Sequence, residues 1–170
     1  MSAENSGTEW APEELEMACL AAVGLSNSDI GHMFGRSEQT VKGRVDGVLA
    51  GVGLATKREL ARLIIQRGEN GNLVLDPRFA NELTRSTREF VKEVLDELSK
   101  KALLAKRLLF DREVEVLKLL RRGAGNKEIA SCLGIEESTV KAHVSGLIRK
   151  MGVENRYQAS LVGDAMGLGP

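Results

Sequence analysis

Apolar residues in the C-terminal third of the chain recur at steps of three and four, the spacing of amphipathic helices. The longest series is Val140, Val144, Leu147, Ile148 and Met151. Glycines at positions 123 and 134 end two shorter apolar series before it, as glycine commonly does after a helix. Asn155 and Gln158 have the spacing of a capping pair at the start of a further helix. The pattern predicts four short helices between residues 109 and 170.

The same arrangement occurs twice along the sequence. Residues 10–63 align with residues 109–162 at a constant offset of 99 positions without a gap, and 14 positions are identical. Glycine falls on glycine at four of these positions. An ungapped repeat of this kind predicts two copies of one helical module. We call residues 10–68 the first copy and residues 109–170 the second copy.

Residues 69–108, between the two copies, are predicted to form a turn, a short extended piece and a long helix. The turn covers residues 69–72 and the extended piece residues 73–75. The dipeptide Asp76–Pro77 then has the form of a helix cap followed by a first-turn proline. No glycine or proline follows in this region, so an unbroken helix over residues 79–109 would be about 46 Å long.

Apolar residues on this predicted helix alternate steps of four and three, as in a coiled coil. They are Val91, Leu95, Leu98, Ala102, Ala105 and Leu109, and the stripe is widened by Phe79, Leu83, Phe90 and Val94. The pattern favours a homodimer whose interface contains Val91, Leu95, Leu98 and Ala102. The alternative is a helix that packs against the chain's own modules.

In the second copy, a short helix, a glycine-containing turn and an amphipathic helix follow one another, which is the order of a helix-turn-helix. The second helix of that motif can lie in the DNA major groove, so its polar face decides the function. That face carries Ser138, Lys141, Ala142, Ser145 and Arg149. Helical bundles that never touch DNA share the same pattern, so the pattern alone leaves both interpretations open.

Specific residues of the second copy carry a family resemblance. The runs concerned are Arg112–Leu117, Gly123–Ala130, Leu133–Ile135, Ser138–Val144 and Arg149–Arg156. Together they resemble the LuxR-type helix-turn-helix domain. Region four of sigma factors shares the Thr-Val-Lys helix, but the run Gly152–Arg156 before a fourth helix favours the LuxR type. Two residues depart from the family pattern, because Phe110 replaces a capping threonine and Glu136 replaces a serine.

The resemblance implies a bacterial transcription regulator that binds duplex DNA as a dimer. It implies that Lys141, Ala142 and Ser145 face bases. It places Thr139, His143 and Arg156 near phosphates. The full predicted DNA-binding set is Ser138, Thr139, Lys141, Ala142, His143, Ser145, Arg149, Lys150 and Arg156.

The first copy resembles the family less well. Arg36 stands where the second copy has Ile135, which we expect in the core, and Asp46 stands where it has Ser145. A carboxylate on the groove-facing side repels phosphates. We therefore predict weaker DNA binding by this copy or, in its place, a protein partner that binds residues 10–68. The weaker DNA-binding set is Gln39, Thr40, Lys42 and Arg44.

Other features of the first copy concern its helices. Ser26, Ser37 and Thr56 are predicted to cap the second, third and fourth of them. Glycines at 43 and 47 each cost roughly 1 kcal/mol relative to alanine within the third. The fourth helix has an apolar stripe, which suits either core packing or an intermolecular interface. Its members are Leu60, Leu63, Ile64 and Ile65.

Composition narrows the function further. With 24 basic and 24 acidic residues, DNA binding depends on where the charges lie rather than on their sum. The two cysteines and two histidines have no ligand or redox partners in the sequence, and no catalytic or phosphate-loop motif occurs. We therefore expect no enzyme activity, no metal and no cofactor. No apolar run could span a bilayer, and residues 1–9 lack a secretory signal, so we expect a flexible N-terminus and a cytoplasmic location.

The sequence thus predicts an all-α protein of two four-helix LuxR-type modules joined by a long amphipathic helix. We interpret the chain as a homodimeric transcription regulator that enters the major groove with its C-terminal module. The alternative is an interaction protein that pairs with a LuxR-type regulator and keeps it off DNA.

Overall fold

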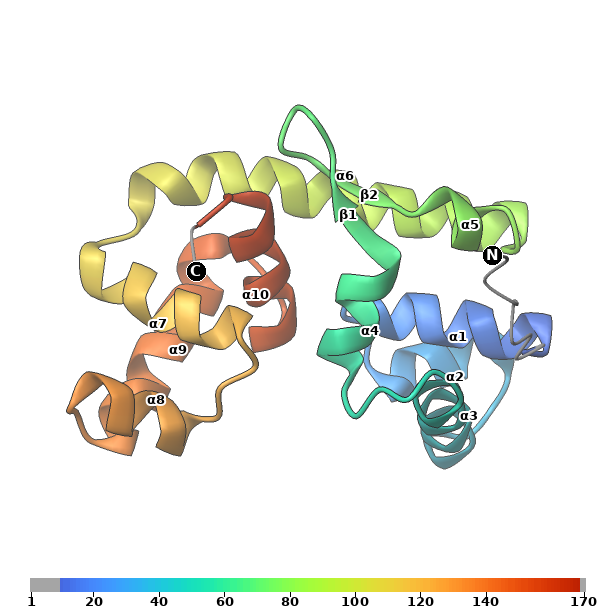
Figure 1. Cartoon of the computed structure of the whole chain (residues 1–170), viewed down its shortest axis with the longest axis horizontal. Coiled ribbons are helices and arrows are strands. Elements are labelled where there is room, and N and C mark those ends of the chain that lie inside the picture. The colour runs from blue at the N-terminus through green and yellow to red at the C-terminus, as the bar shows by residue number, and fades with distance from the viewer. Residues whose placement is uncertain (1–9, 169–170) are drawn as a thin grey trace, which may run out of the picture. The chain divides into compact units, whose positions relative to one another are not determined.

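In the computed structural model the chain is described from residue 10 to residue 168, and most of these residues are helical (Figure 1). The elements are α1 (Pro12–Ala22), α2 (Asn27–Phe34), α3 (Glu38–Gly51), α4 (Lys57–Ile64), β1 (Ile65–Arg67), β2 (Leu73–Leu75), α5 (Pro77–Ala80), α6 (Arg85–Leu108), α7 (Asp111–Arg121), α8 (Asn126–Leu133), α9 (Glu137–Met151) and α10 (Arg156–Ala165). The segment 1–9, predicted to be flexible, lies outside the described residues.

The chain divides into two compact units. Unit 1 contains the residues up to Ile64 together with Asp76–Val91. Unit 2 contains Ile65–Leu75 together with the residues from Lys92 onward. The predicted connecting segment 69–108 is therefore shared between the two units.

Unit 1 is built around α1–α4. Its most buried side chains, each at most 1% exposed, include Met17, Leu20, Ile30, Val41, Val45 and Leu60. The predicted caps Ser26, Ser37 and Thr56 are confirmed, because each hydroxyl accepts a backbone N–H three residues further along the chain. Cys19 is fully buried, and this burial raises the pKa of its thiol to about 12.

A β-hairpin interrupts the helices and corrects the all-α prediction. β1 pairs antiparallel with β2, with Ile65 opposite Leu75. The turn between them closes through a hydrogen bond from the Gly68 N–H to the Asn72 carbonyl at 2.8 Å. The extended piece and the turn were predicted, but Ile65 was wrongly placed in a helix. Two adjacent isoleucines fit a helix and a strand equally well, so only the pairing with β2 decides between them.

The long helix also begins later than predicted. α5 ends at Ala80, and α6 starts at Arg85. Residues 81–84 separate the two helices. The hydroxyl of Thr84 accepts the Thr87 N–H at 3.4 Å, and the Thr84 N–H donates to the buried Glu16 carboxylate at 2.9 Å. No glycine or proline marks this break, because a threonine cap and a distant acceptor produce it.

The apolar stripe of α6 lies inside the chain. Val91, Leu95, Leu98 and Ala102 are at most 2% exposed. Side chains buried to this extent within a single chain cannot form a surface seam for a second copy, so the predicted dimer interface at these four residues does not fit the structure. The burial agrees with the alternative, a helix that packs against its own chain.

Unit 2 is built around α7–α10. Buried side chains with at most 1% exposure include Val116, Leu117, Ile129, Val140 and Leu147. Asn155 caps α10 as predicted, because its side chain accepts the Gln158 N–H at 2.9 Å. Phe110 and Glu136 provide no side-chain cap for α7 and α9, in agreement with the departures noted in the sequence. None of the described helices combines the length and the apolar character needed to cross a membrane.

Candidate nucleic-acid interface

α9 separates a buried face from an exposed one. The buried face consists of Val140, Val144, Leu147 and Met151, each at most 7% exposed. The exposed residues of the predicted DNA-binding set on this helix are Ser138, Thr139, Lys141, Ala142, Ser145, Arg149 and Lys150. His143 is half-buried. The helix thus turns small and basic side chains to solvent, as a helix that enters a groove requires.

The turn before α9 fixes the direction of that helix. Gly134 ends α8 in the left-handed region, with φ of 63°, which an L-residue with a side chain adopts only with strain. The N–H of Ile135 then donates to the Ala130 carbonyl at 3.1 Å. Ile135 was predicted to belong to the core, but its side chain is only half-buried.

Arg156 has partners within unit 2. Its guanidinium donates to the Asn126 side-chain oxygen at 3.0 Å and to the Ala124 carbonyl at 2.8 Å. These bonds join the first residue of α10 to the first residue of α8 and to the loop before it. A contact of Arg156 with a phosphate stays a prediction. The same side chain already makes hydrogen bonds within unit 2.

Lys150 forms an ion pair that the sequence analysis missed. Its Nζ lies 2.6 Å and 2.8 Å from the two oxygens of Glu113 and 4.4 Å from the centre of the Phe110 ring. Burial raises the pKa of Glu113, but the hydrogen bonds from Lys150 and from the Phe110 N–H lower it by more. The pKa of Glu113 therefore lies below its usual 4.5. The charge of Lys150 is therefore largely compensated.

Lys141 is more accessible than Lys150. Its Nζ lies 3.3 Å from Glu137 one turn earlier, and the two side chains are 63% and 49% exposed. Exposed ion pairs of this kind contribute little free energy, so a phosphate or a base can replace Glu137 as the partner. Lys141 is consequently better placed than Lys150 for a contact in the groove.

A comparison with known families assigns this part of the chain. Residues 107–162 match the family described as bacterial regulatory proteins, luxR family. This segment is a LuxR-type helix-turn-helix domain. The chain therefore carries the DNA-binding domain of a family of bacterial regulatory proteins.

Several curated proteins similar to this chain are named as bacterial regulators. The glycerol metabolism activator of Pseudomonas putida is 38% identical over 99 residues, which cover 54% of this chain and 40% of that protein. The nitrate/nitrite response regulator protein NarP of Escherichia coli (strain K12) is 32% identical over 133 residues, covering 70% of this chain and 62% of that protein. The CsgBAC operon transcriptional regulatory protein of the same strain is 54% identical over 52 residues, covering 31% and 24%.

These matches cover parts of longer relatives. The chain spans 40% and 41% of the length of two of the similar proteins, the glycerol metabolism activator and a transcriptional regulatory protein of Bacillus subtilis. No solved structure matches the chain.

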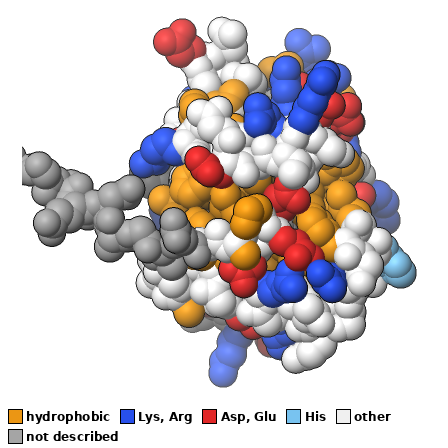
Figure 2. All heavy atoms as spheres, turned by 90° about the vertical axis from the view of Figure 1, so that its right-hand side faces the viewer, with side chains coloured by type: hydrophobic (Ala, Val, Ile, Leu, Met, Phe, Trp, Pro, Cys, Tyr) orange, Lys and Arg blue, Asp and Glu red, His pale blue; other side chains and the backbone are white. Residues whose placement is uncertain are grey.

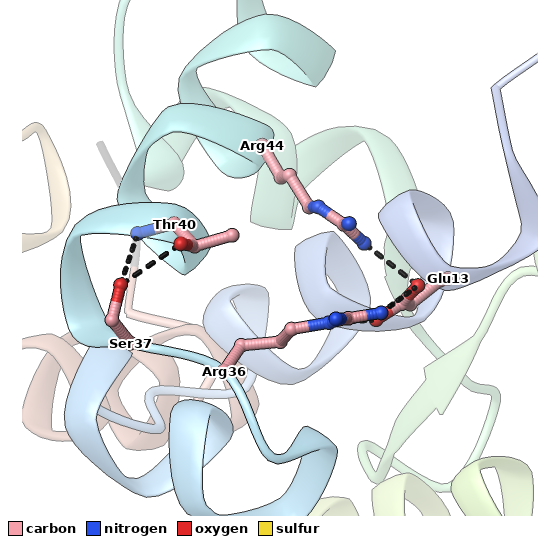
Figure 3. A network of polar contacts seen from close by, with 5 residues as sticks. All are labelled: Glu13, Arg36, Ser37, Thr40 and Arg44. Carbon is pink, nitrogen blue, oxygen red and sulfur yellow. Dashed lines mark hydrogen bonds and ion pairs between the residues drawn. The ribbon is translucent and has the colours of Figure 1, made fainter.

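Unit 1 presents a different surface from the LuxR-type domain. On α3, Gln39, Thr40, Lys42 and Asp46 are exposed. The Thr40 hydroxyl hydrogen-bonds the Ser37 hydroxyl at 2.8 Å, and Arg44 pairs with Glu13 at 2.8 Å (Figure 3). Of the four residues predicted to bind DNA weakly, two are therefore engaged in contacts within unit 1.

Charged side chains of both signs occur together on one face of the molecule. Figure 2 shows a face on which hydrophobic side chains form a central band, with Lys and Arg interspersed among Asp and Glu above and below it. A continuous basic surface, the usual electrostatic footprint of a nucleic-acid-binding face, is not seen in this view of the described residues.

Proposed function

We propose that the chain is a transcription regulator that binds duplex DNA by inserting α9 into the major groove. The observation that carries this proposal is the exposed face of α9 within the LuxR-type domain, which presents Lys141, Ala142 and Ser145 to solvent. We assign these three side chains to contacts with bases. Thr139 and His143 lie beside that face and would contact phosphates. Each phosphate contact releases counterions, so affinity should fall steeply with salt.

We also propose that residues 10–68 are a second, degenerate copy of the same domain, connected by residues 69–108 to the copy at 109–170. Equivalent contacts support this proposal. Lys57 Nζ donates to the Asn27 side chain at 2.6 Å, and the residues 99 positions later, Arg156 and Asn126, make the same contact at 3.0 Å.

The first helices of the two copies supply a further pair of equivalent bonds. Glu14 accepts the Ala11 N–H at 3.1 Å, and Glu113 accepts the Phe110 N–H at 3.0 Å. A shared set of local bonds at one constant offset favours common ancestry over two unrelated helical bundles.

Helix-turn-helix proteins usually read paired half-sites, so we propose that the chain binds DNA as a homodimer. The buried α6 stripe is not available for this contact, and an exposed surface must supply it. Leu103, Leu104, Leu108 and Phe110 are 66%, 63%, 52% and 73% exposed and are the large apolar residues most accessible on unit 2 among those described.

A second candidate function rests on the same apolar side chains. Exposed apolar groups gathered in one stretch are common at protein interfaces. They favour an interaction protein that pairs with a LuxR-type regulator and keeps it off DNA. Such a protein would lower the DNA affinity of that regulator without binding DNA itself.

The two candidates differ in a direct binding experiment with the full chain. A fluorescently labelled random duplex is titrated at about 50 mM and 200 mM salt, because a DNA binder loses affinity steeply over that range. Lys141→Ala should weaken binding by roughly 1–3 kcal/mol if the side chain reads a base. Lys92→Ala, an exposed lysine on α6, serves as the matched control and should bind like the wild type. Absence of binding by the folded wild-type chain at low salt would favour the interaction protein.

A further inference from the structure

A single carboxylate on α1 holds two arginines of unit 1 (Figure 3). Glu13 Oε1 lies 3.0 Å from Arg36 Nε, and Glu13 Oε2 lies 2.8 Å from Arg44 Nη1. A second Arg36 nitrogen approaches Oε2 at 3.5 Å. The three side chains come from three different elements: α1, the turn between α2 and α3, and α3 itself.

The two arginines occupy places where a DNA-binding copy would use positive charge. Arg36 lies in the helix-turn-helix turn, and Arg44 stands at the position of His143 in the LuxR-type domain. On α3 itself, Lys42 is exposed, and Glu38 and Asp46 are exposed carboxylates on the same helix. With both arginines paired, the charge of this face is close to neutral.

The LuxR-type domain has the opposite sign at the position of Glu13. Its counterpart 99 residues later is Arg112, which donates to the Leu133 carbonyl at 2.8 Å and pairs with Glu115 at 2.7 Å. The second copy therefore has a cation at the position of Glu13, and the carboxylate next to it, Glu113, pairs with Lys150 at the end of α9.

We propose that Glu13 is the residue that suppresses DNA binding by the first copy, because its carboxylate holds both Arg36 and Arg44 and offsets one of their two positive charges. This inference rests on the proposal that residues 10–68 are a degenerate copy of the LuxR-type domain. It goes beyond that proposal in naming one side chain whose removal turns a silent copy into one that binds phosphates.

The energetics of the contact fit such a role. The side chains of Glu13, Arg36 and Arg44 are 32%, 46% and 29% exposed, and exposed ion pairs contribute little to stability. The main effect of losing the carboxylate is therefore on surface charge. Hydrogen bonds from Arg36 and Arg44 hold the pKa of Glu13 below its usual value, so the carboxylate is ionised at neutral pH.

The expected effect can be stated as a salt dependence. The logarithm of the DNA binding constant falls with the logarithm of salt concentration by about 0.9 for each phosphate neutralised. Two released arginines should therefore steepen this slope by up to about 2 in the Glu13→Gln chain. Affinity at low salt should rise at the same time, by about tenfold or more.

The test uses the full chain and a matched control. Glu89 also pairs with an arginine, Arg85, at 2.9 Å within unit 1, on α6. Glu13→Gln should steepen the salt slope and Glu89→Gln should not, with far-ultraviolet circular dichroism used to check that both chains are folded. If the two variants bind alike, Glu13 does not suppress DNA binding and the inference is overturned.

A second variant keeps the inference testable should Glu13→Gln not fold. Arg44→Gln in the otherwise natural chain should leave affinity and salt slope nearly unchanged, because Glu13 already holds the Arg44 guanidinium away from phosphates. In the Glu13→Gln chain the same substitution should remove about half of the gain. A loss of affinity from Arg44→Gln alone, as large as that from Lys141→Ala, would overturn the inference.

The Lys141→Ala chain separates this inference from the proposed function. If Lys141→Ala binds DNA like the wild type, the proposed role of α9 fails, whatever Glu13→Gln shows. If Lys141→Ala loses affinity and Glu13→Gln gains none, the role of α9 stands and the role of Glu13 fails.

Discussion

The Arg156 guanidinium and the Asn126 side-chain oxygen are 3.0 Å apart, and this bond joins the first residues of α10 and α8. It fixes the start of the helix that precedes the turn, and through the turn it fixes the direction of α9. Unit 1 makes the corresponding bond with a lysine, Lys57, in place of the arginine. Arg156 was predicted from the sequence to contact phosphates because of its charge. In the structure it also joins two helices of unit 2.

Replacing Arg156 should therefore destabilise unit 2. Arg156→Ala removes two charge-assisted hydrogen bonds and should lower the free energy of unfolding by roughly 1.5–3 kcal/mol. Urea denaturation followed by circular dichroism measures this loss. Arg149→Ala, at an exposed position of α9, is the control and should unfold like the wild type. Unchanged unfolding of Arg156→Ala together with weaker DNA binding would assign the side chain to phosphates alone.

The Glu113–Lys150 ion pair should make the stability of unit 2 depend on pH. The folded-state pKa of Glu113 lies below its usual 4.5, so the stabilisation is complete above that value and disappears as the pH falls through the lower folded-state pKa. At pH 7, Glu113→Gln should cost roughly 1–2 kcal/mol. The difference in melting temperature between wild type and variant should shrink as the pH is lowered from 6.5 towards 3.5. A difference that stays constant over this range would contradict the prediction.

Gly31 should tolerate no side chain, unlike its counterpart Ala130. A Cβ added at Gly31 would lie 2.6 Å from the Arg36 carbonyl oxygen, which is backbone and cannot move aside cheaply. Gly31→Ala should destabilise unit 1 by roughly 1–3 kcal/mol. Gly43→Ala is the control, because nothing lies within 4 Å of the added atom and alanine favours a helix by about 1 kcal/mol. Equal melting temperatures for the two variants would be evidence against this packing of the turn.

Charged substitutions on α6 should show which of its apolar residues belong to the core of the chain and which lie on an exposed surface. Leu95 is 1% exposed and Leu104 is 63% exposed. Leu95→Asp should destabilise the chain by about 4 kcal/mol or more, since it buries a carboxylate without a partner. Leu104→Asp should leave the unfolding free energy within about 0.5 kcal/mol of the wild type. Sedimentation and denaturation of both variants are the measurements. A folded, stable Leu95→Asp monomer derived from a dimeric wild type would restore the predicted seam.

The sequence predicted those features that depend on local patterns. The periodicity of Val140, Val144 and Leu147 placed the buried face of α9, and hydroxyl side chains at Ser26 and Ser37 marked the helix starts. Each of these depends on residues at most one or two helical turns apart. The polar face of α9 followed directly, because it is the complement of the buried one.

Features that depend on distant partners were missed. The break before α6 involves Thr84 and Glu16, which are 68 positions apart. The ion pair of Lys150 with Glu113 spans 37 positions, and that of Arg36 with Glu13 spans 23. A helical pattern shows which side chains point outward but not which outward side chains meet. The α6 stripe was ambiguous for the same reason, since a coiled-coil seam and an internal core have the same spacing.

The division of the chain has a consequence for how the protein is made. The hairpin Ile65–Leu75 belongs to unit 2, while the residues that follow it, Asp76–Val91, return to unit 1. On the ribosome, α1–α4 emerge first but remain without part of their unit until Val91 has been synthesised. The hairpin must wait longer still, for the chain beyond Lys92. Each unit therefore needs residues that are translated after, or apart from, its own sequence copy. A truncation between the two copies would remove residues from both units.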